Sequence, residues 1–145
     1  MGWTVATTKR ALADAGGREV ALAGGVGWLA EDDDDAPATE PWVALLPGLD
    51  PTTMGWKERA WYLPESAAEA FDSSGNAGPT IWLDGRVVGA WAQSPDGEVH
   101  LHSFEKVATS RRREIDERVA DLRRWVGETR FTIRFPAAIH QTLLS

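Results

Sequence analysis

The chain has 145 residues, a formal net charge of −7 and no cysteine. This length allows one domain with a buried core, or one domain plus a fragment of another, and the lack of cysteine excludes disulfides and cysteine-based zinc sites. No apolar run approaches the roughly 20 residues of a membrane-spanning helix, and the N-terminus has no apolar signal-peptide segment. We therefore expect a cytoplasmic protein with no membrane partner.

Charge is distributed unevenly along the chain. Residues 1–105 carry 6 basic and 17 acidic side chains, a formal charge of −11, whereas residues 106–145 carry 9 basic and 5 acidic side chains, a formal charge of +4. The net field of an acidic protein does not steer it toward nucleic acid. Any contact with DNA would have to use a local basic face, for which the C-terminal third is the candidate.

The N-terminal part of the chain predicts a helix followed by a hairpin. The helix is expected over residues 4–15 and ends at a glycine pair, and strands are expected over residues 18–23 and 26–30 around a second glycine pair. This order is that of the back half of a winged-helix unit, although it also occurs in unrelated α+β folds. We interpret residues 1–31 as the remnant of a winged-helix unit.

An acidic, proline-containing linker is predicted over residues 32–41. The five consecutive carboxylates from Glu31 to Asp35 repel one another and resist packing. A calcium site is the alternative, but the alternating spacing and the turn glycine of an EF-hand loop are missing from this stretch. The remaining residues, 42–145, are predicted to form one further domain.

That domain begins with an apolar stretch over residues 42–46, which is typical of a short buried strand. Asp50 is a favourable N-cap and Pro51 suits the first helical position, so a helical turn is expected to start there. Ser66 and Glu69 have the spacing of a capping box, which predicts a second helix start.

The clearest structural signal is a two-residue hairpin turn at Asp84 and Gly85. It joins strands predicted over residues 80–83 and 86–93, because both turn residues tolerate positive φ. A turn at residues 95–97 then leads into a third strand that ends at residue 104. The middle strand is apolar on both faces, which indicates that it is covered on both sides, as in a small barrel or a sheet packed under helices.

The strongest helix prediction spans Val107–Val126. Its apolar side chains recur at intervals of four, three and four residues from Ile115 onward, and they form one stripe. A final strand is expected over residues 130–135, followed by a short helix. The predicted fold class is α+β, with a partial winged helix followed by a small antiparallel β-barrel or sheet that is capped by this amphipathic helix.

Three consecutive arginines, Arg111 to Arg113, lie near the predicted start of this helix. Cations at that end oppose the helix dipole unless an anion is nearby, so the cluster indicates a phosphate contact. The alternative is a simple surface cluster neutralised by the acidic residues at 114–117. Together with Arg118, Arg123, Arg124 and Arg130, the cluster could follow a phosphate backbone.

Four residues outside this helix are also predicted to lie near DNA. Lys57 and Arg59 are candidates for phosphate contacts, and Trp91 and Gln93 are placed near a duplex-facing loop. A base could stack on Trp91, and the alternative is that this tryptophan belongs to the core. The predicted DNA-binding residues are Lys57, Arg59, Trp91, Gln93, Arg111, Arg112, Arg113, Arg123 and Arg124.

Metal and catalytic chemistry have little support in the sequence. His100 and His102 share one face of the third predicted strand, but a third metal ligand would have to come from His140 or a carboxylate. The alternative is a pair of solvent-facing histidines. No nucleophile-elbow sequence is present. We therefore predict no metal, no cofactor and no catalytic residue.

Two long sequence words carry a family resemblance. They are LLPGLDPTTMGWK at Leu45–Lys57 and PTIWLDGRVVGAWAQ at Pro79–Gln93, and the RFP at Arg134–Pro136 and the hairpin around Trp28 also fit. The chain resembles the C-terminal region of the winged-helix DNA-binding proteins typified by the AlkZ and YcaQ DNA glycosylases. The resemblance implies tandem winged helices around a β-barrel core, DNA binding, and excision of alkylated or cross-linked purines.

The same resemblance shows where the chain departs from the family pattern. Members use a Gln-hydrophobic-Gln or His-hydrophobic-Gln motif, whereas this chain has only Gln93 and Gln141, and His100-Leu101-His102 lacks the glutamine. It therefore resembles the C-terminal portion of a longer family protein, or a truncated stand-alone copy. We expect no enzymatic activity from this chain by itself.

One functional expectation and two alternatives follow. The chain is expected to bind or scaffold double-stranded DNA, with an N-terminal winged-helix half or a second copy of itself as a further partner. The first alternative is that it forms part of an active DNA glycosylase that needs the missing N-terminal half. The second is a structural or oligomerisation module that does not bind DNA, which its acidic character favours.

Overall fold

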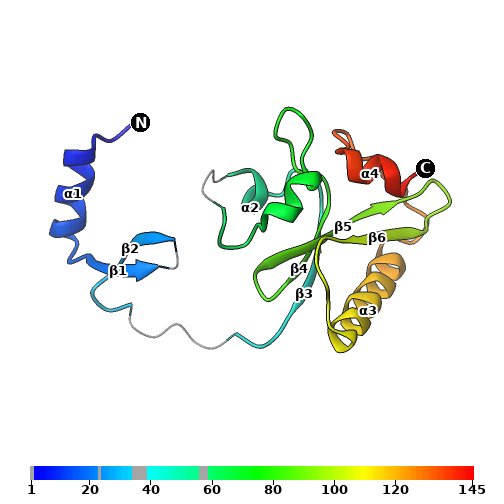
Figure 1. Ribbon diagram of the computed structural model, residues 1–145, viewed down its shortest axis with the longest axis horizontal. Helices are drawn as coiled ribbons and strands as arrows, with labels where there is room; N and C mark the ends of the chain where they lie inside the picture. Colours follow the sequence, from blue (N-terminus) through cyan, green and yellow to red (C-terminus); the bar gives the residue numbers. More distant parts are fainter. Residues whose placement is uncertain (1, 23, 34–38, 56–58) are drawn as a thin grey trace. The chain divides into compact units, whose positions relative to one another are not determined.

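The structure is a computed structural model that describes residues 2–22, 24–33, 39–55 and 59–145. The chain divides into two compact units, Met1–Thr39 and Glu40–Ser145. Each unit contains one antiparallel sheet, with one helix in the first unit and several in the second, so the α+β class is confirmed (Figure 1). Part of the predicted linker, residues 34–38, lies outside the described residues.

The first unit consists of a helix and a hairpin. Helix α1 (Val5–Asp14) starts at Thr4, whose hydroxyl oxygen accepts a hydrogen bond from the Thr7 backbone N–H at 3.2 Å. Strands β1 (Arg18–Leu22) and β2 (Gly25–Leu29) then pair antiparallel. The predicted helix and hairpin are therefore confirmed, each within a residue or so of the expected bounds.

The second unit is built on a four-stranded antiparallel sheet in the order β3-β4-β5-β6. Its strands are β3 (Val43–Leu46), β4 (Thr80–Leu83), β5 (Arg86–Gln93) and β6 (Val99–Ser103). Among the described residues β3 and β6 are the two edges of this sheet, so of the two expected alternatives, a barrel or a sheet, the structure forms an open sheet and no closed barrel. Four short strands are too few to curl round until their edges pair.

Strand β5 is covered on both faces, as its sequence predicted. On one face Val88 and Trp91 pack with Ile115 of helix α3 (Thr109–Val126). On the other face Val87 packs with Trp82 and with Ala67 of the 3₁₀ helix η1 (Glu65–Ala70). Helix α4 (Ala138–Leu143) also packs against η1 and β5.

Local turn chemistry agrees with the sequence at two positions. Asp84 and Gly85 both have positive φ, 49° and 85°, as the two-residue hairpin requires. Asp50 caps helix α2 (Pro51–Met54) by accepting a hydrogen bond from the Thr52 backbone N–H at 2.9 Å. The hairpin and the cap were predictable because each is decided by adjacent residues.

Two local predictions are wrong. The Ser66–Glu69 capping box is not formed, because η1 starts after Pro64 and has no side-chain cap. Residues 130–135 are not a strand but an irregular segment between α3 and α4. Their alternating apolar side chains reflect contacts with the sheet and with two cavities, not pairing in a β-ladder.

Every helix in the described part of the chain is too short or too polar to cross a membrane.

Candidate nucleic-acid interface

Arg111 is partly buried at the start of α3. Its side chain is 18% exposed, and its Nη2 donates to Asp84 Oδ1 at 2.8 Å and to the Trp42 carbonyl oxygen at 3.0 Å. Its Nη1 pairs with Glu114. These contacts tie the first turn of α3 to the β4–β5 turn, so Arg111 is less available to a phosphate than Arg112 and Arg113.

Three further arginines of α3 are ion-paired on its surface. Arg118 and Arg124 both pair with Asp121, and Arg123 pairs with Glu98 beside β6. Exposed pairs of this kind are weak and are screened by salt, so a phosphate can compete for the guanidinium. The predicted DNA contacts of Arg123 and Arg124 stay predictions. In such a contact each arginine would exchange its carboxylate partner for a phosphate.

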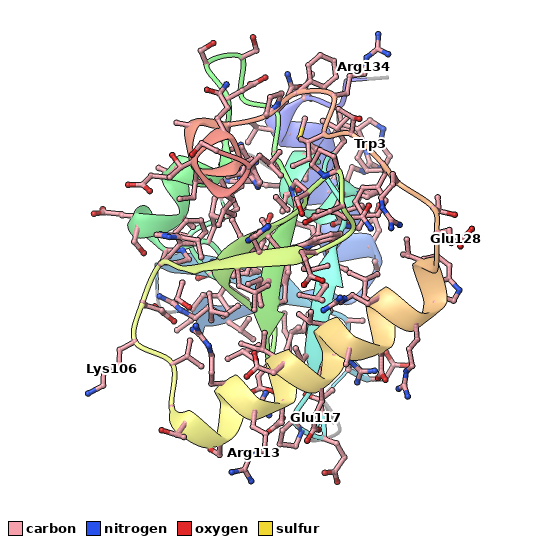
Figure 2. All side chains as sticks on the ribbon, turned by 90° about the vertical axis from the view of Figure 1, so that its right-hand side faces the viewer. Trp3, Lys106, Arg113, Glu117, Glu128 and Arg134 are labelled. Carbon is pink, nitrogen blue, oxygen red and sulfur yellow. The ribbon has the colours of Figure 1, made fainter. Side chains whose placement is uncertain are left out.

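Three cations without a described carboxylate partner gather around the first turn of α3. Lys106 and Arg113 are exposed, and Arg112 donates from Nη1 to the Ser103 hydroxyl oxygen at 2.8 Å and has no described carboxylate partner. Figure 2 shows the labelled Lys106 and Arg113 pointing outward from the second unit. We call Lys106, Arg112 and Arg113 the α3-start basic surface.

Trp91 and Gln93 lie in the interior. Trp91 is 2% exposed, and its Nε1 donates to the Leu46 carbonyl oxygen at 3.0 Å. The Gln93 amide donates to the Thr129 carbonyl oxygen at 3.4 Å and accepts from the Phe131 backbone N–H at 3.2 Å. In this conformation both side chains fix the segment after α3 and present little surface to a duplex.

Arg59 and Lys57 were predicted together with the α3 arginines. Arg59 instead contacts residues near α2 and η1, since it donates to the Thr53 carbonyl oxygen and its Cζ lies 4.7 Å from the centre of the Phe71 ring. Lys57 lies outside the described residues. The structure therefore gathers the arginines of α3 on one helix and places Arg59 on other elements.

Sequence reasoning included Arg130 among the arginines that could follow a phosphate backbone, but it did not recognise residues 130–135 as a second basic feature. Arg130 donates to the carbonyl oxygens of Gly127 and Thr129, at 2.9 and 3.0 Å, and has no described carboxylate partner. Arg134 is exposed, and its Cζ lies 5.8 Å from the centre of the Phe135 ring. The available signal was the interleaving of cations and aromatic rings, which is typical of nucleic-acid-binding segments but was interpreted as a strand.

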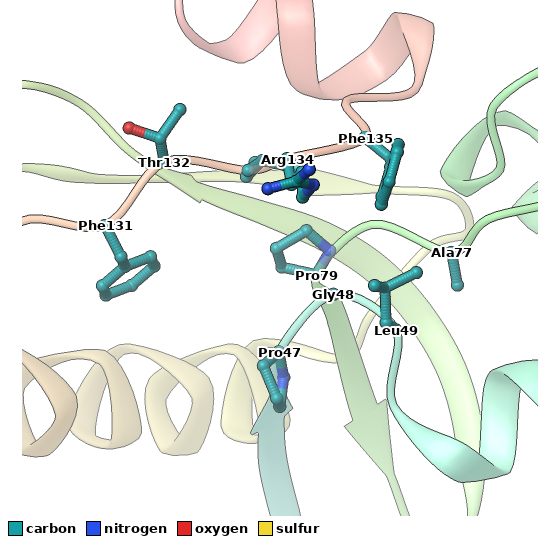
Figure 3. A pocket seen from close by; sticks show the side chains of 10 residues that line it. Pro47, Gly48, Leu49, Ala77, Pro79, Phe131, Thr132, Arg134 and Phe135 are labelled. Carbon is teal, nitrogen blue, oxygen red and sulfur yellow. The ribbon is translucent and has the colours of Figure 1, made fainter.

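A pocket of about 300 Å³ lies against this segment. Figure 3 shows Phe131 and Phe135 on opposite sides of the pocket, with Arg134 between them. A neighbouring cavity of about 460 Å³ lies along the same segment and is lined in part by Gln93 and Gln141. The first pocket is lined by Pro47, Gly48, Leu49, Ala77, Pro79, Phe131, Thr132, Ile133, Arg134 and Phe135.

The three histidines have separate environments. His100 contacts the Ser94 hydroxyl at 3.3 Å, and the His102 ring lies 5.5 Å from that of Phe104. His140 is fully buried, and its Nε2 donates to the Pro79 carbonyl oxygen at 3.0 Å. Burial lowers the pKa of His140, and the hydrogen bond to Pro79 partly opposes that change. No group of three metal-ligating side chains occurs among the residues that the structure describes.

Comparison with protein families gives one match. The family model described as DNA glycosylase AlkZ-like matches residues 1–125. Comparisons with curated proteins and with solved structures give no match. The family match includes both sequence words quoted above and most of helix α3.

Proposed function

Because the chain belongs to the AlkZ-like DNA glycosylase family, which relates it to DNA repair, we propose that it binds and scaffolds DNA and is not catalytic by itself. In this proposal it is the C-terminal part of a winged-helix glycosylase-like protein. The first unit, with its helix and hairpin, is then the back half of a winged-helix unit. The second unit supplies the basic face that contacts the duplex.

The α3-start basic surface carries the proposal. Its three cations have no described carboxylate partner, whereas Arg111, Arg118, Arg123 and Arg124 are each ion-paired. Uncompensated cations at the start of a helix are unfavourable in the free protein, because they face the positive end of the helix dipole. A DNA phosphate would relieve this repulsion and also accept hydrogen bonds from the guanidinium groups.

The expectation that this chain is not catalytic is supported by the positions of its two glutamines. Both ends of the Gln93 amide are hydrogen-bonded to the backbone of residues 129–131. Gln141 donates to the Pro136 carbonyl oxygen at 3.5 Å. A base-release assay on alkylated DNA, with and without an added N-terminal winged-helix half, separates this reading from the alternative of an active glycosylase.

The test of the proposed surface is the salt dependence of duplex binding. We expect the Arg112→Ser/Arg113→Ser variant to lower the slope of log affinity against log salt by roughly 1.8, because each lost phosphate contact removes about 0.9. Arg118→Ser is the matched charge control: Arg118 lies on the same helix but is paired with Asp121, so its loss should lower the slope by less than the loss of either arginine of the surface. Equal slopes for the wild type and the double variant would exclude this surface.

The alternative of an oligomerisation module makes a different prediction. Trp125 of α3 is 84% exposed, which is unusual for so large an apolar side chain. If this side chain drives self-association, sedimentation equilibrium will show a dimer that Trp125→Ser converts to a monomer. A protein that forms such a dimer and shows no salt-dependent binding to duplex DNA would favour the structural module over the DNA-binding reading.

A further inference from the structure

We propose that the pocket beside residues 130–135 binds one unpaired nucleotide of a DNA strand. The inference rests on the proposed DNA-binding function and adds which form of DNA the protein prefers. It concerns a surface distinct from the α3-start basic surface, because the pocket is built from the loop after β3, residues 77–79 and the segment after α3.

The pocket walls suit a flat aromatic group. Phe131 and Phe135 are both 38% exposed and stand on opposite sides of the pocket, while Pro47, Leu49 and Pro79 line its base (Figure 3). A volume of about 300 Å³ is at the lower end of the range for small-molecule sites. Aromatic side chains bind bases by stacking, and this interaction tolerates any base identity.

The charge of the pocket suits an attached phosphate. Arg134 is exposed between the two phenylalanine rings, and no carboxylate is among the residues that line the pocket. Arg130 lies four residues earlier and bonds only to carbonyl oxygens of the described chain. Arg134 is the arginine that lines this pocket, whereas Arg130 lines the neighbouring cavity. An apolar pocket with one exposed guanidinium group at its edge is complementary to a ring that carries a negative charge, as a nucleotide does.

The pocket is held in shape by the surrounding structure. Trp91 meets Phe131 edge to face with ring centres 5.6 Å apart, and Gln93 fixes the backbone on both sides of Arg130. Leu49 has a positive φ of 61°, which is uncommon for a residue with a large side chain, and its N–H donates to the Ala77 carbonyl oxygen at 2.8 Å. A strained residue fixed at a pocket wall is a frequent feature of binding sites.

The proposed occupant is an unpaired nucleotide, because both flat faces of a paired base are already stacked against neighbouring bases in the duplex. In a duplex each base is stacked between its neighbours, so it cannot enter a pocket walled by two phenylalanines without leaving the stack. An unpaired base loses less on leaving, because no partner strand holds it. The pocket also has few side-chain hydrogen-bond groups with which to read a base edge, so we expect little sequence preference.

The experiment compares two fluorescent probes by anisotropy with the full chain at low salt. One is a fully paired duplex, and the other is the same duplex with a single unpaired thymine. We expect the unpaired thymine to raise the affinity of the wild type by about tenfold, which is the scale of one stacking interaction. Phe135→Ala and Arg134→Gln should each remove most of this preference and change the affinity for the paired duplex by less than about twofold.

Trp125→Ala is the matched control, because this aromatic side chain is exposed but lies outside the pocket lining. It should keep the preference for the unpaired thymine. Thermal unfolding of each variant identifies a loss that is due to misfolding, and Arg134→Gln tests the site without altering an apolar wall.

The outcomes separate this inference from the proposed function. Salt-dependent binding of both probes with equal affinity would overturn the nucleotide site and leave the DNA-binding proposal standing. A preference that survives both Phe135→Ala and Arg134→Gln in folded protein would place the recognition elsewhere and also overturn the inference. No binding of either probe would overturn both.

Discussion

Replacing Arg111 with alanine should weaken folding, whereas replacing Arg113 with alanine should not. Arg111 donates to Asp84 at 2.8 Å and to the Trp42 carbonyl oxygen at 3.0 Å, and it pairs with Glu114. A hydrogen bond to a charged group contributes about 1.5–3 kcal/mol when it is shielded from water. The contacts of Arg111 therefore set an upper estimate of several kcal/mol for the loss.

Three features lower that estimate. Asp84 is about half exposed, so water screens its attraction for Arg111. The Nε of Arg111 is buried without a described partner, which offsets part of the gain. Asp84 also keeps its hydrogen bond from the Trp42 backbone N–H when Arg111 is removed. We therefore expect a loss of about 2 kcal/mol in the free energy of unfolding for Arg111→Ala.

Urea unfolding followed by tryptophan fluorescence measures this difference. Arg113→Ala should lie within about 0.5 kcal/mol of the wild type, as is usual for a substitution at the surface. A double-mutant cycle of Arg111→Ala with Asp84→Asn should give a coupling of about 1 kcal/mol. Equal unfolding free energies for Arg111→Ala and Arg113→Ala would refute the conclusion that Arg111 stabilises the fold while Arg113 is available to bind a phosphate.

Two further predictions concern the buried histidine. Because burial lowers the pKa of His140 below 6.5, the unfolded chain takes up a proton before the folded protein does. The free energy of unfolding should be highest above about pH 6.5 and fall by at most ~1.4 kcal/mol per pH unit as the pH is lowered toward 5. Urea titration at each pH should show that a His140→Gln variant lacks this slope. An equal slope in the variant and the wild type would rule out His140 as its cause. An alanine at Gly78 would place its Cβ 2.1 Å from the His140 ring, whereas one at Gly48 would approach no atom closer than 3.4 Å. Thermal unfolding should therefore show a larger loss for Gly78→Ala, about 2–3 kcal/mol, than for Gly48→Ala, and the reverse order would show that His140 does not pack against Gly78 as described.

Some of the candidate site could be predicted because it depends on nearby residues. Helix α3 was expected from its apolar stripe, and the cluster of three arginines at its start was visible in the sequence. The division of roles within that cluster could not be predicted. Asp84, which binds Arg111, and Glu98, which binds Arg123, are 27 and 25 residues away in sequence.

Residues 130–135 show why a local pattern can mislead. Alternating Phe131, Ile133 and Phe135 is typical of a strand, yet an extended segment between two cavities gives the same alternation. A strand also needs backbone hydrogen bonds to a neighbouring strand, and residues 130–135 pair with no strand of the described sheet. The pocket, and the exposure of Arg134 within it, therefore lay beyond what periodicity could indicate.

The sequence by itself determined the α+β class, the Asp84-Gly85 turn, the Asp50 cap and the burial of β5 on both faces, because each depends on backbone preferences or on hydrophobic patterning over a few residues. Only the tertiary structure decided that the sheet is open and that Trp91 and Gln93 lie inside. It also decided which arginines remain uncompensated. These properties depend on which distant side chains and strand edges come together when the chain packs.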